Sequence, residues 1–278
     1  MGISPREVPK KRFLKFIAGK LSPLSNKSGA SNQVITLPKG GGALSGIGET
    51  FSPDLHTGTG NFTVPIALPP GRNGFKPEAN LIFSTGNGNG PFGLGWGLSL
   101  PGVSRKTSQG VPRYRDDSSD LEDGDIFILS GAEDLVPVAA SQSTTRYQPR
   151  TEGLFARIER WTNVTSGEIH WRSISKDNVI SLYGRTNNSR IFDPEDDNPD
   201  HPTRIFSWLL CETLDHKGNA ILYEYKEEDG AGVDLSKAHE RNRGDLNDKR
   251  RAVNRYIKRI YYGNRETTLD KVTGERPL

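Results

Sequence analysis

Residues 206–226 read FSWLLCETL-DHKG-NAILYEYK, two apolar runs joined by a four-residue turn. In the return run, Ile221, Tyr223 and Tyr225 share one face of an extended chain, and the residues between them take the other face. Alternation with a period of two is the pattern of a half-buried β-strand. The stretch therefore predicts an antiparallel hairpin, and with it a β fold.

Similar short apolar runs, bounded by Gly, Pro and Asn, extend from this hairpin in both directions. They predict strands at residues 60–70, 80–84, 125–129, 134–138, 155–161, 168–174, 179–183, 206–214, 219–226 and 255–262. Residues 32–110 show no sustained helical periodicity. Residues 227–251 hold 13 charges in 25 positions and predict a long solvated loop. We predict an all-β fold, an antiparallel sheet, sandwich or barrel.

Length and composition restrict the class of protein. A chain of 278 residues suggests one large domain or two smaller ones. With 26% charged residues, 31 Gly and 18 Pro, the composition is that of a soluble globular protein. No stretch approaches the roughly 18 apolar residues of a membrane-spanning helix, which excludes an integral membrane protein. Cys211 is the single cysteine, so there is neither a disulfide framework nor a thiolate metal cluster.

The net charge of +3 conceals an asymmetry along the chain. Residues 1–30 carry seven Lys and Arg against one acid, whereas residues 31–278 carry 30 basic and 33 acidic side chains. The body of the protein is therefore not a nucleic-acid binder by charge. The apolar run of the tail is shorter than the about 7–15 residues of a signal peptide, so we expect no secretory signal. The tail is either a frayed terminus or a basic amphipathic stripe, the one place where we allow membrane contact.

Motifs for catalysis and cofactor binding are largely missing. Residues 88–93 match G-x-G-x-x-G, but no helix follows, as a dinucleotide site requires. The histidines lack the spacing of a zinc site; they are His56, His170, His201, His216 and His239. Cys211 lies in an apolar run with no visible base or electropositive setting, so we interpret it as a core residue. We predict no catalytic residue, no cofactor and no metal site.

Two acidic clusters are the remaining candidates for ion binding. The first contains Asp116, Asp117, Asp120, Glu122, Asp123 and Asp125, and the second contains Asp193, Glu195, Asp196, Asp197 and Asp200. Alignment of Gly124 with the invariant glycine of an EF-hand places Ser119 and Leu121 where acids are required. We interpret both clusters as solvated loops. Calcium binding stays open as the alternative, which a calorimetric titration at millimolar Ca²⁺ tests.

Several motifs occur in a fixed order. They are ITLPKGGGAL (35–44), GIGETF (46–51), GTGNF (58–62), GPFGLGW (90–96), PRY (112–114) and SGAEDLVP (130–137), followed by Trp208, DHKGN (215–219) and YEY (223–225). This series, which covers about residues 33–264, resembles the N-terminal region of the SpvB family and of TcB-type subunits of insecticidal toxin complexes. The last three motifs are similar to the family's first tyrosine–aspartate, Rhs-like strands.

What the resemblance implies is structural. In TcB-type proteins this region helps to build a hollow β shell, shared with a TcC-type partner, which encloses a toxic polypeptide and docks on a TcA-type pore. The resemblance thus implies TcC-type and TcA-type partners and a secreted or extracellular location. In SpvB-like toxins a mono-ADP-ribosyltransferase follows this region. Its Arg, Ser-Thr-Ser and Glu-x-Glu elements are not recognisable in this chain, so we expect that the protein is not an enzyme and does not ADP-ribosylate actin.

We divide the chain into a basic flexible tail (1–32), an SpvB-like β domain (33–264) and a polar C-terminal segment (265–278). The leading hypothesis is a non-catalytic module of a toxin shell, with a sheet edge that continues into further sequence or pairs with another chain. The expected packed positions are Gly93, Gly95 and Trp96 in one turn and Trp208, Gly218, Asn219 and Tyr223 in the hairpin. The alternative is a stand-alone surface- or carbohydrate-binding β module that uses Trp161 and Trp171 as stacking platforms. A third class, a hydrolase with paired carboxylates from the acidic clusters, has no supporting spacing in the sequence.

Overall fold

The computed structural model describes residues 50–54, 59–116, 124–130, 133–153, 155–196, 202–241, 245 and 247–268. Contacts within the chain divide it into two compact units. The larger unit contains residues 71–75 and the chain from residue 101 onward, and the smaller unit contains the rest of the described chain up to residue 100. The predicted basic tail lies outside the described residues.

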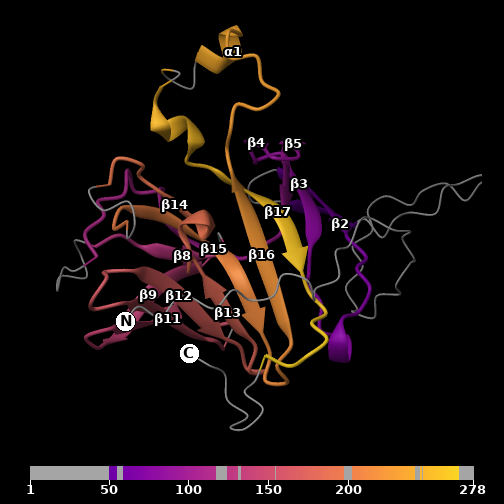
Figure 1. Cartoon of the computed structure of the whole chain (residues 1–278), viewed down its shortest axis with the longest axis vertical. Coiled ribbons are helices and arrows are strands. Elements are labelled where there is room, and N and C mark those ends of the chain that lie inside the picture. The colour runs from indigo at the N-terminus through magenta and orange to yellow at the C-terminus, as the bar shows by residue number, and fades with distance from the viewer. Residues whose placement is uncertain are drawn as a thin grey trace, which may run out of the picture. The chain divides into compact units, whose positions relative to one another are not determined.

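The larger unit is built on one antiparallel sheet of eleven strands. The strands are β7 (Gly102–Arg105), β8 (Phe127–Leu129), β9 (Glu133–Ala140), β10 (Thr144–Pro149), β11 (Arg157–Thr162), β12 (Ile169–Ile174), β13 (Ile180–Tyr183), β14 (Arg190–Phe192), β15 (Ile205–Leu214), β16 (Ala220–Glu227) and β17 (Arg255–Tyr261). Short helical turns complete the unit: η1 (Arg72–Gly74), η2 (Asn187–Ser189), α1 (Ala238–Arg241) and η3 (Lys249–Ala252). The prediction of an all-β antiparallel fold is confirmed (Figure 1).

Eight of these strands close into a barrel. The order runs β13-β12-β11-β10-β9-β8-β7-β15, and β13 pairs back with β15 to complete the ring. β15 is the junction, because its first half also pairs with β14 and its last three residues with β16. An eight-stranded barrel has an interior just wide enough to be filled by side chains.

Aromatic side chains fill that interior. Trp171 and Trp208 have no solvent exposure, and Phe127 and Tyr147 are 3% and 6% exposed. The Phe127 ring lies 5.0 Å from the Trp171 ring and 5.8 Å from the Trp208 ring, edge to face. The buried Trp208 indole N–H of β15 donates to the Ile169 carbonyl of β12 at 3.2 Å. Burial of four large rings in favourable geometry supplies much of the apolar stabilisation of the unit.

The hairpin of β15 and β16 confirms the prediction from the alternating pattern. Tyr223 and Tyr225 are buried, and Lys226 is exposed. In the turn, the Asp215 carboxylate accepts the backbone N–H groups of Lys217 (2.9 Å) and Asn219 (2.8 Å) and the Asn219 side-chain amide (2.6 Å). A carboxylate that satisfies the backbone donors of its own turn fixes the register of the two strands.

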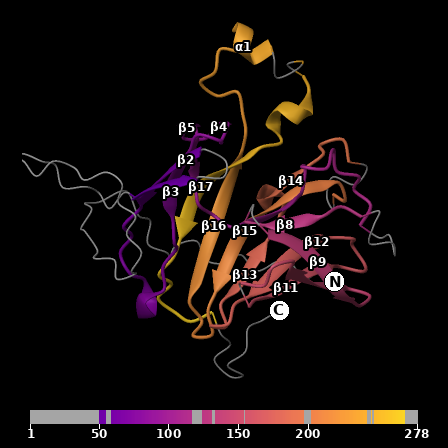
Figure 2. The ribbon, with the colours of Figure 1, turned by 180° about the vertical axis from the view of Figure 1, so that it is seen from behind.

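β16 and β17 extend the sheet beyond the barrel, and the chain between them carries α1 past the end of both strands (Figure 2). The prediction of a plain solvated loop at residues 227–251 is wrong in part, because α1 and η3 form there. The Asp248 carboxylate accepts the Arg250 N–H at the start of η3, at 2.9 Å. The Arg251 guanidinium joins the two helical turns by donating to the Glu240 carboxylate at 3.0 Å. Charged side chains in this segment therefore stabilise its helical turns and are not merely exposed to solvent.

The smaller unit holds a four-stranded antiparallel sheet in the order β1-β2-β3-β6 and a separate two-stranded ribbon, β4-β5. The strands are β1 (Thr50–Asp54), β2 (Thr59–Pro65), β3 (Asn80–Ser84), β4 (Asn89–Gly90), β5 (Gly93–Leu94) and β6 (Trp96–Leu98). β2 and β3 match predicted runs. The sequence did not reveal β1, β4, β5, β6, β7, β10 or β14. β10, for example, reads TTRYQP and buries only Tyr147 and Pro149.

Candidate functional site

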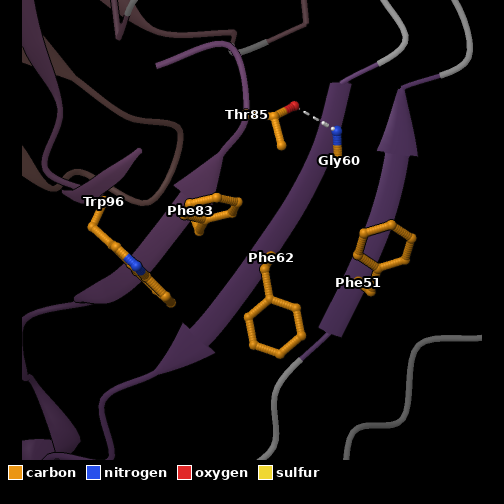
Figure 3. A pocket seen from close by; sticks show the side chains of 6 residues that line it. All are labelled: Phe51, Gly60, Phe62, Phe83, Thr85 and Trp96. Carbon is orange, nitrogen blue, oxygen red and sulfur yellow. Dashed lines mark hydrogen bonds between the residues drawn. The ribbon is translucent and has the colours of Figure 1, made fainter. Parts of the chain in front are cut away.

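A row of four aromatic side chains crosses the four-stranded sheet of the smaller unit. Phe51 of β1 pairs with Phe62 of β2, Phe62 pairs with Phe83 of β3, and Phe83 pairs with Trp96 of β6. Directly opposed residues on neighbouring strands project from the same face. The four rings, one per strand, therefore form a continuous row, which we call the aromatic row (Figure 3).

Two glycines lie where a side chain would crowd a ring of the aromatic row. A Cβ on Gly95 would stand 2.5 Å from the Phe83 ring, and Gly95 also has φ +78°. A Cβ on Gly60 would stand 3.3 Å from the Phe51 ring. Only glycine fits such an approach at a positive φ. Of the predicted packed turn, Gly95 is buried and leaves space for the aromatic row, and Trp96 is half-buried. The prediction is wrong for Gly93, which is exposed and where a Cβ would meet nothing within 4 Å.

The aromatic row lines a shallow apolar pocket of about 310 Å³, together with Gly60 and Thr85. Phe51 is 44% exposed, and the other three rings are half-buried. The Thr85 hydroxyl accepts the Gly60 N–H at 3.0 Å, as Figure 3 shows. The pocket offers ring surface and no charged side chain, so its chemistry is that of a hydrophobic contact surface.

A second cluster lies inside the barrel, where Arg105 of β7 meets two carboxylates. Its Nη1 donates to Asp116 (2.6 Å) and to Asp125 (2.7 Å), and its Nε donates to the Ile205 carbonyl (2.7 Å). The side chain of Arg105 has no exposure, and those of Asp116 and Asp125 are 9% and 8% exposed. The guanidinium also lies over the Phe127 ring at 5.0 Å. Buried charges persist in a protein when they are paired in this way.

Asp125 is held in its charged form. Burial alone would raise its pKa, but the N–H groups of Arg113 and Tyr114 and the Arg105 guanidinium outweigh burial, so the pKa is lowered. The described members of the first acidic cluster, Asp116 and Asp125, thus bind an arginine inside the fold. The interpretation of these two residues as a solvated loop is wrong; the sequence between them, residues 117–123, lies outside the described residues.

The second acidic cluster also contains a carboxylate that forms hydrogen bonds within the chain. The Asp196 carboxylate accepts the N–H groups of Thr203 (2.9 Å) and Arg204 (2.7 Å). Asp196 is 7% exposed and closes the loop before β15, so it too is not a solvated side chain. Asp197 and Asp200 lie outside the described residues. In the described part of the chain, no three His, Cys, Asp or Glu side chains gather as metal ligands would.

The two tryptophans proposed as stacking platforms have different environments. Trp171 is in the barrel core with no exposure, which fits core packing and leaves the alternative of a stacking platform without support at this residue. Trp161 lies half-buried on the outer face of β11, with its ring stacked on His170 at 6.3 Å and the Arg172 guanidinium at 4.6 Å. Its indole N–H donates to the Glu159 carboxylate at 3.0 Å. Trp161 is thus engaged by its own neighbours.

Cys211 lies on β15, half-buried against the apolar cluster of Leu182 and Leu214. Its thiol donates to the Leu182 carbonyl at 3.1 Å. Burial raises the pKa of the Cys211 thiol, which keeps it protonated and a poor nucleophile. Among the described residues, no helix has the length and apolar character to cross a bilayer.

Comparison with solved structures relates both units to bacterial toxins and effectors. The crystal structure of TcdB2-TccC3 matches 90% of this chain with a TM-score of 0.67 and 30% identity, over 12% of its own chain. The Photorhabdus luminescens Tc holotoxin pore also matches 90% of this chain, with a TM-score of 0.66, 29% identity and 12% of that chain covered. The N-terminal domain of effector protein SpvB from Salmonella typhimurium matches 73% of this chain and 64% of its own, with a TM-score of 0.60 and 30% identity.

These likenesses define the class: an antiparallel β module of bacterial toxin proteins. Residues 54–277 match the family model described as Salmonella virulence plasmid 65kDa B protein. Mono(ADP-ribosyl)transferase SpvB of Salmonella typhimurium and that of Salmonella dublin are each 34% identical to this chain over 263 residues. The chain belongs to the SpvB family, and the resemblance stated from the sequence is confirmed.

The expectation that the protein is not an enzyme is contradicted by these relatives, which are named as transferases. The alignment covers 89% of this chain and 41% of each relative, so the chain spans less than half the length of the curated relatives that it matches. The solved neighbour is the N-terminal domain of SpvB. The expectation was wrong because it rested on the transferase motifs of this chain alone, which corresponds to only one region of its relatives.

The sequence analysis missed both the aromatic row and the buried Arg105. The sequence contains no usable signal for Arg105, because β7 was not predicted; the structure shows that Val103 and Arg105 share the buried face of that strand. The aromatic row has no local signal. Its residues lie in four separate runs and come together only through the register of the sheet.

Proposed function

We propose that this chain forms part of the wall of a β shell that encloses a toxic polypeptide and helps to deliver it. The single observation that carries the proposal is the likeness to TcdB2-TccC3, which extends over 90% of this chain at 30% identity. A likeness of that extent includes both the barrel and the smaller unit.

The architecture suits a wall. The closed ring pairs the backbone groups of eight strands, which leaves β16 and β17 as an extension of the sheet beyond the barrel. A sheet that continues outward from a rigid barrel can join further strands without loss of backbone pairing. The aromatic interior and the Arg105 ion pairs connect strands across the barrel and so stabilise its closed form.

The finer assignments follow from the family. We propose TcC-type and TcA-type subunits as partners and a site of action outside the producing cell. We also retain the division into a tail (1–32), an SpvB-like β domain (33–264) and a polar segment (265–278). Carbohydrate binding through Trp171 has no supporting observation, since that side chain is fully buried.

A chimera tests the proposal. In a TcdB2-type subunit, the region that matches this chain is replaced by this chain, and the product is co-expressed with a TccC3-type partner. We expect the chimera and the partner to co-elute as one closed particle on size-exclusion chromatography. A subunit that lacks the region altogether is the reference. The proposal is overturned if the chimera and the deletion assemble equally poorly while the chimera remains folded.

A further inference from the structure

Three arginine side chains surround one carboxylate on the outer face of the barrel. Arg146 of β10 is opposite Glu159 of β11, which is opposite Arg172 of β12 (β11 and β12 are labelled in Figure 1). Directly opposed residues project from the same face, and Arg157, two residues from Glu159 on β11, shares it. The neighbour of Arg172, Trp171, lies in the barrel core, so this face is the outer one. We call Arg146, Arg157 and Arg172 the arginine patch.

One carboxylate does not balance the three guanidinium groups. Glu159 accepts hydrogen bonds from Nε of Arg157 and from Nε (3.0 Å) and Nη2 (2.6 Å) of Arg172. Glu159 is 1% exposed, whereas the side chains of Arg157 and Arg172 are 58% and 27% exposed. Arg146 is exposed and makes no ion pair or side-chain hydrogen bond within the described part of the chain. The patch therefore presents an excess of positive charge to solvent.

The titratable groups nearby do not cancel this charge. Asp134 of β9 is paired with Lys106 at 2.8 Å and lies 3.8 Å from Arg150. His170 of β12 is neutral at pH 7, because burial lowers its pKa to about 4. Guanidinium groups that are open to solvent pair with carboxylates or phosphates. The arginine patch is thus suited to an anionic partner.

Aliphatic side chains border the arginine patch on β9. Val136 is opposite Gln148, which lies two residues from Arg146 on β10, so Val136 projects from the same outer face. Val136 is 37% exposed, and Val138, in the β-bulge opposite Arg146, is 48% exposed. The outer face of β9 to β12 therefore offers cations and aliphatic surface side by side.

This combination limits the class of partner. A nucleic acid or a sulfated polysaccharide supplies anions but no aliphatic side chains, and the 33 acidic against 30 basic side chains of residues 31–278 disfavour a long polyanion. Membranes with anionic lipids attract clusters of about four to eight basic residues, more than the three of this patch. A polypeptide that carries both acidic and aliphatic residues matches both parts of the surface.

We propose that the outer face of β9 to β12 binds an acidic segment of another polypeptide chain, with acidic and aliphatic side chains on the same face of the segment. The acidic side chains pair with Arg146 and Arg157, and the aliphatic ones cover Val136. In an extended segment, residues on one face recur about every 6.7 Å. Strand geometry places the Cα atoms of Arg146 and Arg157 about 8 Å apart, a difference that flexible arginine side chains accommodate.

A designed peptide tests the inference. The probe is a fluorescein-labelled peptide of three Glu-Ser-Leu-Ser repeats with blocked ends, titrated with the full chain by fluorescence anisotropy. We expect Arg146→Gln and Gln148→Glu, two changes at exposed side chains, each to weaken binding about five-fold or more. Arg250→Gln removes one positive charge at another exposed site of the larger unit and should leave binding unchanged. Raising NaCl from about 0.05 to about 0.5 M should weaken binding about ten-fold, because salt screens exposed charges.

Several outcomes overturn the inference. They are an absence of peptide binding, equal effects of Arg146→Gln and Arg250→Gln, and equally tight binding of a peptide with Lys in place of Glu or with Ser in place of Leu. Binding of phosphatidylserine vesicles or of oligothymidine that Arg146→Gln abolishes, without peptide binding, would make the patch a membrane or nucleic-acid surface instead. Urea midpoints of Arg146→Gln and Gln148→Glu equal to that of the wild type show that the variants are folded. Assembly of the chimera is measured separately, so the two proposals can fail independently.

Discussion

Arg105 carries a positive charge into the barrel, where its guanidinium is shielded from water and paired with Asp116 and Asp125. Removal of the guanidinium leaves Asp125 without its cation and leaves Asp116 with Arg160 alone, at 3.3 Å. Removing one partner of a buried ion pair typically costs about 3–5 kcal/mol. We therefore expect Arg105→Met to lower the free energy of unfolding by about 3 kcal/mol or more in urea titrations. Arg250→Met is the control, since Arg250 pairs with Glu195 at an exposed site and should change stability little.

His170 makes stability depend on pH. Burial, followed by the nearby Arg185 guanidinium, lowers the pKa of His170 from 6.5 to about 4; Arg190 and Arg172 act in the same direction and Glu168 opposes them. The unfolded chain then takes up the proton before the native state does. Stability that is present above pH 6.5 is therefore lost as the pH falls towards 4.

We expect His170→Gln to flatten that part of the profile. The variant's urea midpoint should fall less than that of the wild type between pH 6.5 and 4.5, a window above the ordinary pKa of carboxylates. Parallel profiles for the two proteins would show that His170 does not titrate differently in the native and unfolded states.

At the scale of elements, the β15–β16 turn depends on one carboxylate. Asp215 accepts three hydrogen bonds from its own turn and is 7% exposed. Asp215→Ala leaves those donors without their acceptor, so we expect a loss of about 2–3 kcal/mol in the free energy of unfolding. Asp177→Ala, in the exposed β12–β13 turn, is the control. Similar midpoints for the two variants would refute the role given to Asp215.

The position of the aromatic row depends on glycine at residue 95. Gly95→Ala places a methyl group in the Phe83 ring at a positive φ, and such overpacking costs about 1–3 kcal/mol. Gly97→Ala, two residues further on in β6, meets nothing within 4 Å and should match the wild type in its free energy of unfolding. The argument fails if the two alanine variants behave alike.

Local pattern predicted the elements that alternate clearly. The 206–226 hairpin was found because Ile221, Tyr223 and Tyr225 repeat every second residue, and β10 was missed because its mostly polar sequence shows no such repeat. The closure of β13 on β15 joins segments about 30 residues apart, and local sequence does not encode that pairing. The same holds for the aromatic row. Arg105 was missed because β7 was not predicted and because a charged residue in a strand is ordinarily assigned to the solvent face.

At the scale of the whole molecule, the family places this chain among toxin modules, and we propose that its role there is that of a shell wall. A shell wall, unlike a binding module, protects the polypeptide that it encloses from proteases. Loss of one part of a closed wall opens a path to the interior.

The most direct measurement is the half-life of the enclosed polypeptide under proteinase K in the TcdB2-type chimera with its TccC3-type partner. The account predicts a half-life close to that in the parent complex, and one many times longer than in the complex that lacks the matching region. A half-life in the chimera equal to that in the deleted complex would contradict the assignment of this chain to the wall of a shell.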